Sequence, residues 1–253
     1  MTSPNAPALS PQEQEKAQAA AAAVRWVRDG MVLGLGTGTT SAHFITQLGE
    51  RVRQGLKVRG LATSLASEAL ARQVGIPLLE PRRGLTFDLA VDGADELDHQ
   101  LRLIKGGGGA LLREKVLETA ACYLLVIADS SKLVPRLGRF PLPLEVVPFA
   151  LSWVLDAVEK LGGAPALRMA KDDPGSPVYS DQKNLLVDCH FGQIGDAEHL
   201  AAQLKTIPGI VEHGLFLGLA RAAVIIQGGQ AQVLRPGQAA RPATEFAELP
   251  EGG

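Results

Sequence analysis

The chain has 253 residues, a formal net charge of −2, and 46% apolar and 21% charged residues. These values are ordinary for a globular protein and lack the basic excess of a broad nucleic-acid interface, so no nucleic-acid partner is expected. No segment approaches the ~18 consecutive apolar residues of a membrane span, and residues 1–11 do not resemble a secretion signal. The two cysteines, Cys122 and Cys189, are expected to be buried and reduced. We therefore predict a cytoplasmic protein that does not bind membranes.

Short apolar runs alternate with helical segments through the first half of the chain. The expected strands are 31–35, 58–62, 76–79, 88–91 and 123–128, and the expected helices are 12–28, 41–48, 67–74 and 110–118. Apolar strands without polar alternation, separated by helices, are typical of a parallel sheet covered on both faces. This pattern predicts a main α/β domain over residues 12–137.

The pattern changes at Gly138 to an α+β unit. Strands are expected at 141–147, 167–169, 185–189 and 211–214, with helices at 152–160 and 198–206. We predict an inserted domain over residues 138–214, after which residues 215–234 return to the main domain with an apolar strand at 222–226. Residues 1–11 and 235–253 have little periodicity, and we expect disordered tails there.

A glycine-rich loop, Gly34-Leu-Gly-Thr-Gly-Thr-Thr40, joins the first expected strand to a helix. Backbone N–H groups of such a loop can converge on an anion, and the positive end of the following helix adds to the attraction. A dinucleotide fingerprint would need glycine at the place of Thr39, and a Walker loop would need Gly-Lys before Ser or Thr. The loop therefore predicts a site for one phosphate, with a plain strand-to-helix turn as the alternative.

Two aspartates, Asp92 and Asp95, follow the apolar strand at 88–91, with Gly93 and Ala94 between them. In an open parallel sheet, the carboxyl ends of the strands face the ligand crevice. The pair could serve a ligand, or one aspartate could cap the turn while the other is solvated. By itself this segment favours neither.

Lys105 precedes four glycines, residues 106–109, and a helix is expected from Ala110. Four consecutive glycines carry a conformational-entropy penalty, so an unoccupied loop would seldom use them. Helical spacing places Glu114 one turn into the helix, within reach of a small ligand at the glycine loop. The alternative is that Glu114 and its neighbours Arg113 and Lys115 are solvent-exposed charges.

Asp129 and Lys132 follow the apolar strand at 123–128, so they fall at the same edge of the sheet. The motifs thus converge on one crevice with two glycine loops, lysines and carboxylates around a small polar ligand. The five histidines show no paired metal spacing, and neither cysteine has a close partner at ligand spacing. No metal site is therefore expected.

The succession of these motifs resembles type A ribose-5-phosphate isomerases. The matching segments, in order, are Gly36-Thr-Gly-Thr-Thr40, Asp92-Gly-Ala-Asp95, Lys105-Gly-Gly-Gly108, Arg113-Glu-Lys115, Ala128-Asp-Ser-Ser-Lys132 and Phe140-Pro-Leu-Pro-Leu-Glu-Val146. The likeness extends from about Lys16 to Ile226, because Ile207-Pro-Gly-Ile210 and Gly214-Leu-Phe216 also match the family. Six ordered motifs make the resemblance specific, although any one of them would be weak.

The resemblance implies a Rossmann-like α/β fold, with a mostly parallel sheet covered by helices and a smaller inserted α+β, ferredoxin-like domain. It implies an aldose–ketose isomerase of the non-oxidative pentose phosphate pathway, which interconverts D-ribose 5-phosphate and D-ribulose 5-phosphate through an enediolate. It also implies a homodimer or homotetramer that uses no cofactor and no metal.

The resemblance also assigns roles to the motif residues. Glu114 would be the proton acceptor, and Lys105, Asp92 and Asp95 would complete the catalytic set. The substrate-binding residues would be Thr37, Gly38, Thr39, Thr40, Asp92, Gly93, Ala94, Asp95, Lys105, Gly106, Gly107, Gly108 and Lys132, with Lys16 as a further phosphate contact.

This chemistry needs one base that reaches two carbons, donors for two oxygens, and an anchor for the phosphate.

A related-fold sugar-phosphate deaminase or lactonase, or a coenzyme A transferase, is an alternative enzyme. A sugar-phosphate sensor is a non-enzymatic alternative, but it would carry a helix-turn-helix module of about 60 residues before the glycine loop. Only about 33 residues precede Gly34 here, and a single expected helix fills most of them.

Overall fold

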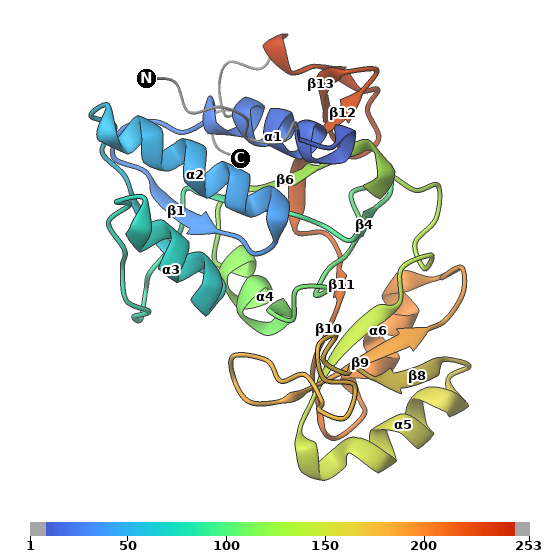
Figure 1. The fold of residues 1–253 in the computed structure, drawn as a ribbon. Helices are drawn as coiled ribbons and strands as arrows, with labels where there is room; N and C mark the ends of the chain where they lie inside the picture. Colours follow the sequence, from blue (N-terminus) through green and yellow to red (C-terminus); the bar gives the residue numbers. More distant parts are fainter. Residues whose placement is uncertain (1–8, 246–253) are drawn as a thin grey trace.

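The computed structural model describes residues 9–245, which form three β-sheets and the helices around them (Figure 1). The helices are α1 (Pro11–Val24), α2 (Thr39–Arg53), α3 (Leu65–Gln73), α4 (Leu111–Thr119), α5 (Leu151–Lys160) and α6 (Ala197–Lys205). Short 3₁₀ helices lie at η1 (Ser130–Lys132), η2 (Pro148–Ala150) and η3 (Ala243–Glu245).

The main sheet has seven strands in the order β14-β13-β12-β6-β3-β1-β2. They are β1 (Val32–Leu35), β2 (Arg59–Ala62), β3 (Leu89–Asp92), β6 (Leu124–Ala128), β12 (Ala220–Gln227), β13 (Gln230–Leu234) and β14 (Arg241–Pro242). Strands β2, β1, β3, β6 and β12 pair in parallel, whereas β13 and β14 add to the edge antiparallel. The predicted α/β fold with a mostly parallel sheet is therefore confirmed.

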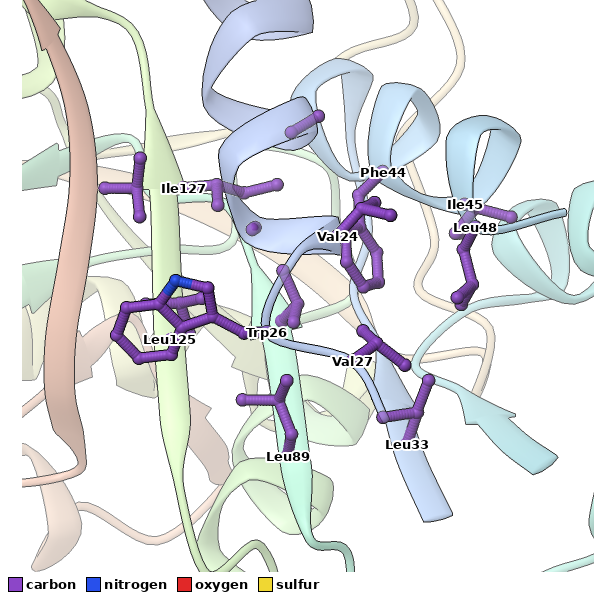
Figure 2. Close-up of a cluster of buried hydrophobic side chains, with 14 of the residues drawn as sticks. Val24, Trp26, Val27, Leu33, Phe44, Ile45, Leu48, Leu89, Leu125 and Ile127 are labelled. Atoms are coloured by element: carbon purple, nitrogen blue, oxygen red, sulfur yellow. The ribbon is translucent and has the colours of Figure 1, made fainter. Parts of the chain in front are cut away.

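Both faces of the main sheet are buried, as a run of consecutive apolar residues requires. On β6, Leu125 and Ile127 belong to the core under α1 and α2, whereas Leu124 and Val126 belong to the core on the opposite face. Figure 2 shows the first of these cores, where Phe44 of α2 and Val24 of α1 lie among the side chains of the strands. These cores fix the ends of the parallel strands, and therefore the loops that follow them.

A second unit has the topology of a ferredoxin-like fold. It contains β7 (Leu142–Val146), α5, β8 (Ala164–Leu167), β9 (Leu185–His190), α6 and β10 (Ile210–His213), and its antiparallel sheet has the order β10-β7-β9-β8. The βαββαβ succession and this strand order are those of the predicted inserted fold. We propose this unit as the inserted domain over residues 138–214, within a main domain of residues 12–137 and 215–234.

A three-stranded antiparallel sheet joins segments from before and after this unit. Its strands are β4 (Glu96–Leu97), β5 (Leu103–Ile104) and β11 (Leu215–Phe216), in the order β11-β5-β4. Because β11 pairs with β5, the chain that leaves the ferredoxin-like unit returns directly beside Lys105, which follows β5.

Several local expectations differ from the structure. Residues 76–79 form a single bridge, between Gly60 and Leu78, instead of a strand. The first helix ends at Val24 rather than at residue 28, because residues 25–27 tighten into i→i−3 hydrogen bonds that turn Trp26 into the core. Cys122 is exposed, whereas Cys189 is buried as expected.

The predicted disordered tails fall partly on described residues. Residues 235–245 are not wholly irregular, because Arg241 and Pro242 pair with Val233 and Gln232 of β13 and a 3₁₀ turn follows. The sheet edge thus orders a segment that has little periodicity of its own. At the other end, residues 9–11 lead directly into α1, where Ser10 accepts a hydrogen bond from the Glu13 N–H as N-cap. The remaining parts of both predicted tails, residues 1–8 and 246–253, lie outside the described residues.

Candidate active site

The first glycine loop places an open helix end beside a lysine. Gly38 is the N-cap of α2 with φ of 101°, a conformation that glycine adopts without strain, and it has no side chain to cap the helix. The first turn of α2 contains no acidic residue. Lys16 of α1 donates to Thr39 Oγ1 at 2.9 Å. The helix dipole, free N–H groups and an ammonium therefore favour an anion at this loop.

The carboxylate of Asp92, at the end of β3, holds this loop in place through hydrogen bonds. Its Oδ1 accepts hydrogen bonds from Thr37 N at 2.9 Å, Ser41 Oγ at 2.9 Å and Gly93 N at 2.7 Å. A Cβ atom at Gly36 would lie 2.0 Å from Asp92 Oδ1, so glycine is required for this close approach. Asp92 is 1% exposed and is not among the residues that line the crevice described below.

Lys105 lies at the centre of a buried charge cluster. Its Nζ lies 2.9 Å from Asp92 Oδ2, 3.2 Å from Glu118 Oε1 and 3.6 Å from Glu114 Oε2. It also donates to the Gly93 carbonyl at 2.7 Å. Although burial opposes its charge, these carboxylates raise the pKa of Lys105 well above its usual value. The lysine is therefore a permanent cation in a low-dielectric site, where it can stabilise negative charge strongly.

Glu114 occupies the first turn of α4, which begins directly after the second glycine loop. The residue is 3% exposed, and burial raises the pKa of its carboxyl to about 8. A pKa close to neutral is the property that a general base needs. Glu114 is thus buried rather than a solvent-exposed charge, which excludes the alternative considered for it above.

The second glycine loop is held by groups from two other parts of the chain. Gly107 N donates to Asp95 Oδ2 at 2.7 Å, and burial raises the pKa of Asp95. Arg168, directly after β8, donates to the carbonyls of Gly106 at 3.0 Å and Gly107 at 3.1 Å. Asp188 of β9 holds the Arg168 guanidinium with two hydrogen bonds. The ferredoxin-like unit therefore contacts the loop that faces the ligand.

These elements surround one small crevice with a cavity volume of about 110 Å³. Its lining residues are Lys16, Thr37, Gly38, Thr39, Thr40, Gly93, Ala94, Asp95, Lys105, Gly106, Gly108, Glu114 and Lys132. Every lining residue belongs to the set expected from the sequence. Two expected substrate-binding residues, Asp92 and Gly107, do not line the crevice. Asp92 is buried beneath the first loop, and the N–H and carbonyl of Gly107 bond to Asp95 and Arg168.

Two charged residues of this region were not expected from the sequence. Glu118 contacts Lys105 from the same helix as Glu114, four residues later, and that spacing is a signal that the sequence does contain. Arg168 contacts the glycine loop across 61 residues of chain, and nothing local to it indicates that contact.

The described residues meet neither the requirements of a metal site nor those of a membrane-spanning helix. Within residues 9–245, no group of three or more His, Cys, Asp or Glu side chains could hold a metal ion. Over the same residues, none of the helices has both the length and the apolar character needed to cross a membrane.

The crevice combines a buried carboxylate with a raised pKa, a buried ammonium and a helix end that favours an anion, a combination that suits proton transfer on a small anionic substrate. The comparisons with known proteins identify the family. Residues 59–230 match the family model of ribose 5-phosphate isomerase A (phosphoriboisomerase A). The ribose-5-phosphate isomerase A of Nitrobacter hamburgensis is 52% identical over 214 residues, which cover 83% of this chain and 92% of that protein.

Solved structures agree with the sequence comparison. The ribose 5-phosphate isomerase A of Methanocaldococcus jannaschii has a TM-score of 0.84 and 40% identity, covering 88% of this chain and 99% of that one. A D-ribose-5-phosphate isomerase in complex with phospho-erythronic acid has a TM-score of 0.86 and 36% identity, covering 89% of this chain and 100% of that one. The chain belongs to the ribose-5-phosphate isomerase A family. It is an enzyme of the pentose phosphate pathway that interconverts ribose 5-phosphate and ribulose 5-phosphate.

Proposed function

We propose that the crevice binds ribose 5-phosphate with its phosphate at residues 37–40 and its C1–C2 end beside Glu114, which moves the proton. The observation that carries this proposal is the position of the Glu114 carboxylate. It is buried, it lies 3.6 Å from the Lys105 ammonium, and it lines the same crevice as the first glycine loop. One small cavity thus contains a base, a cation and an anion site.

The phosphate end is supported by the electrostatics of α2. The N–H groups of its first turn and the Lys16 ammonium provide donors on one side, and Lys132 of η1 lines the other part of the crevice. Binding energy from a remote phosphate can position the reacting carbons, because an anchored substrate reacts without a further search for orientation. The bound ligand of the 36%-identical relative, phospho-erythronic acid, is a four-carbon sugar acid that shares the phosphate group of ribose 5-phosphate. We expect that compound to compete with ribose 5-phosphate here.

The proton transfer uses Glu114 twice. Its ionised carboxylate accepts the proton from C2, the electron pair forms the C1–C2 double bond of an enediolate, and Glu114 then returns the proton to C1. The electron pair of the C1 carbonyl rests on O1 in the enediolate, and the hydroxyl proton moves in the same sense as the carbon-bound one, from O2 to O1. A single carboxylate above both carbons is sufficient for both transfers.

Lys105 supplies the positive charge that the enediolate needs. Its Nζ lies among three carboxylates at 2.9 to 3.6 Å, so the protein itself provides a cation at this point. We propose that no metal and no cofactor take part. Asp95 lines the crevice and is our candidate for the contact with the sugar hydroxyls, whereas we assign Asp92 to holding Lys105 and the first loop.

We also propose, on the family resemblance, that the enzyme is a cytoplasmic homodimer or homotetramer without nucleic-acid or membrane partners. Sedimentation equilibrium of the purified chain distinguishes a dimer from a tetramer, and a monomer would contradict both.

Glu114→Gln tests the assignment of the base. Glutamine keeps the shape but cannot accept the proton, so kcat is expected to fall by roughly 10²–10⁴-fold, while binding of phospho-erythronic acid changes by less than about tenfold, or ~1.4 kcal/mol. Glu159→Gln, an exposed glutamate on α5, is the matched control and is expected to behave as wild type. Near wild-type turnover of the Glu114→Gln variant would contradict the assignment.

A further inference from the structure

A third carboxylate, Glu118, lies behind the crevice and has no role in the mechanism above. It follows Glu114 by one turn of α4, and its side chain is fully buried. Its Oε1 lies 3.2 Å from Lys105 Nζ. Within residues 9–245, neither of its carboxylate oxygens has a hydrogen-bond donor of good geometry. An ionised carboxylate in such a place is disfavoured, because the shared Lys105 ammonium offsets only part of its lost hydration.

The charges of the cluster do not balance if every group is ionised. Asp92, Glu114 and Glu118 surround one ammonium, so full ionisation would leave a net charge of −2 in a buried site. Nearby like charges force at least one carboxylate to hold a proton. Asp95 adds a further carboxylate that acts on Glu114, and Lys115 adds a further cation that interacts with Glu118.

The hydrogen bonds decide which carboxylate holds that proton. Asp92 Oδ1 already accepts three hydrogen bonds, so this oxygen is fully engaged as an acceptor. Glu114 lines the crevice and meets the substrate. Glu118 has neither property, and it is the most enclosed of the three.

We propose that Glu118 is a positioning residue that stays protonated and, as a neutral acid, holds Lys105 and Asp92 in place behind Glu114. A neutral acid has one donor and one acceptor. Its O–H is available to Asp92 Oδ2, another buried oxygen without a hydrogen bond of its own, and its C=O is available to Lys105 Nζ. Glu114 is then the carboxylate of the cluster that titrates. This inference rests on the assignment of Glu114 and Lys105 above.

The pKa of Glu118 is consistent with this role. Burial raises it well above the usual value, Asp92 and Glu114 raise it further, and Lys105 opposes the change. A hydrogen bond that the neutral acid donates to Asp92 raises the pKa of Glu118 in the same direction as burial does.

Two substitutions separate a neutral acid from an anion. Glu118→Leu removes both the donor and the acceptor, so kcat is expected to fall by roughly 10-fold or more with a smaller change in KM, because Lys105 acts mainly on the transition state. Glu118→Gln keeps a donor and an acceptor without a charge, and it is expected to rescue most of that loss. The apparent pKa of the acid limb of kcat/KM should then stay within about 0.5 unit of wild type.

Glu145→Gln is the matched control. Glu145 is also buried and also has an oxygen without a partner, but it lies on β7 with Ser180 and Asn184 and outside the crevice. Its pH profile is expected to match wild type. Three results would each overturn the proposal. The first is a kcat for Glu118→Gln as low as that of Glu118→Leu, and the second is a wild-type kcat for Glu118→Leu. The third is an apparent pKa of the acid limb of kcat/KM that Glu118→Gln lowers by more than about 1 unit.

A second measurement applies if the leucine variant does not fold. An infrared spectrum of the wild type at pH 7 is expected to contain the band of a protonated carboxyl group. Glu118→Gln should lack this band, and Glu145→Gln should retain it. Absence of the band from the wild type would also overturn the proposal. Failure of the Glu114 assignment is recognised separately, because turnover would then survive in Glu114→Gln whatever the Glu118 variants do.

Discussion

Replacing Lys105 by methionine should affect stability and catalysis with different pH dependences. The substitution keeps most of the side-chain volume but leaves Asp92, Glu114 and Glu118 without their shared cation. Removal of one partner of a buried ion pair typically costs about 3–5 kcal/mol. Loss of a preorganised donor for developing negative charge typically lowers kcat by roughly 10²–10³-fold. We therefore expect both effects at pH 8, with kcat reduced more than KM is raised.

The stability loss should shrink as the pH falls. Without Lys105, the folded-state pKa values of Glu114 and Glu118 rise further above 4.5, the ordinary value for glutamate. Groups with a raised folded pKa lose stability as the pH rises from the unfolded value through the folded value. The variant should therefore lie closest to wild type at about pH 5 and furthest from it at pH 8.

Urea unfolding followed by circular dichroism at both pH values measures this difference. Lys171→Met, an exposed lysine, is the control and should unfold as wild type does at both pH values. A stability loss for Lys105→Met that is equal at pH 5 and pH 8 would refute the argument from buried carboxylates. A pure KM effect would show that Lys105 binds the ground state instead of the enediolate.

Three further outcomes are expected. Because burial raises the pKa of Glu114 to about 8 and its ionised form is the base, kcat/KM should increase with pH through about 8, whereas a plateau already reached below pH 6 would disagree. Gly36→Ala should lower both the melting temperature and kcat, since the new Cβ would lie 2.0 Å from Asp92 Oδ1, and Gly195→Ala, with open space around its Cβ, should do neither. Activity should survive prolonged chelation without any gain from Mg²⁺, Mn²⁺ or Zn²⁺, and rescue by one of these metals would count against a lysine-based site.

The ligand-facing residues could be predicted from the sequence because they lie in short contiguous motifs at strand ends. Lys105 and Glu114 are nine residues apart, with a glycine run and one helical turn between them, so their proximity follows from local geometry. Thr37–Thr40 and Lys132 likewise directly follow apolar strands of the main sheet. Parallel strand order then brings these ends to one edge of the sheet.

The supporting interactions could be predicted less well, because they depend on how deeply a side chain is buried and on parts of the chain that are distant in sequence. Asp92 resembles a ligand-facing aspartate in sequence, but its side chain points below the loop and accepts the Thr37 and Ser41 hydrogen bonds. The contact of Arg168 with Gly106 exists only once the ferredoxin-like unit packs against the loop. The edge strands β13 and β14 have weak apolar patterns, and they are defined less by local sequence than by pairing, β13 with β12 and β14 with β13.

The most direct test of the mechanism follows the C2 proton of ribose 5-phosphate in deuterated water. With the wild-type enzyme, deuterium from the solvent should enter at C1 of the ribulose 5-phosphate that forms and at C2 of the ribose 5-phosphate that re-forms, because the base exchanges its proton while the enediolate is bound. With Glu114→Gln, both exchange and turnover should disappear in a folded protein that still binds phospho-erythronic acid. Exchange at the wild-type rate in that variant would mean that another carboxylate of the crevice, with Asp95 tested first, is the base.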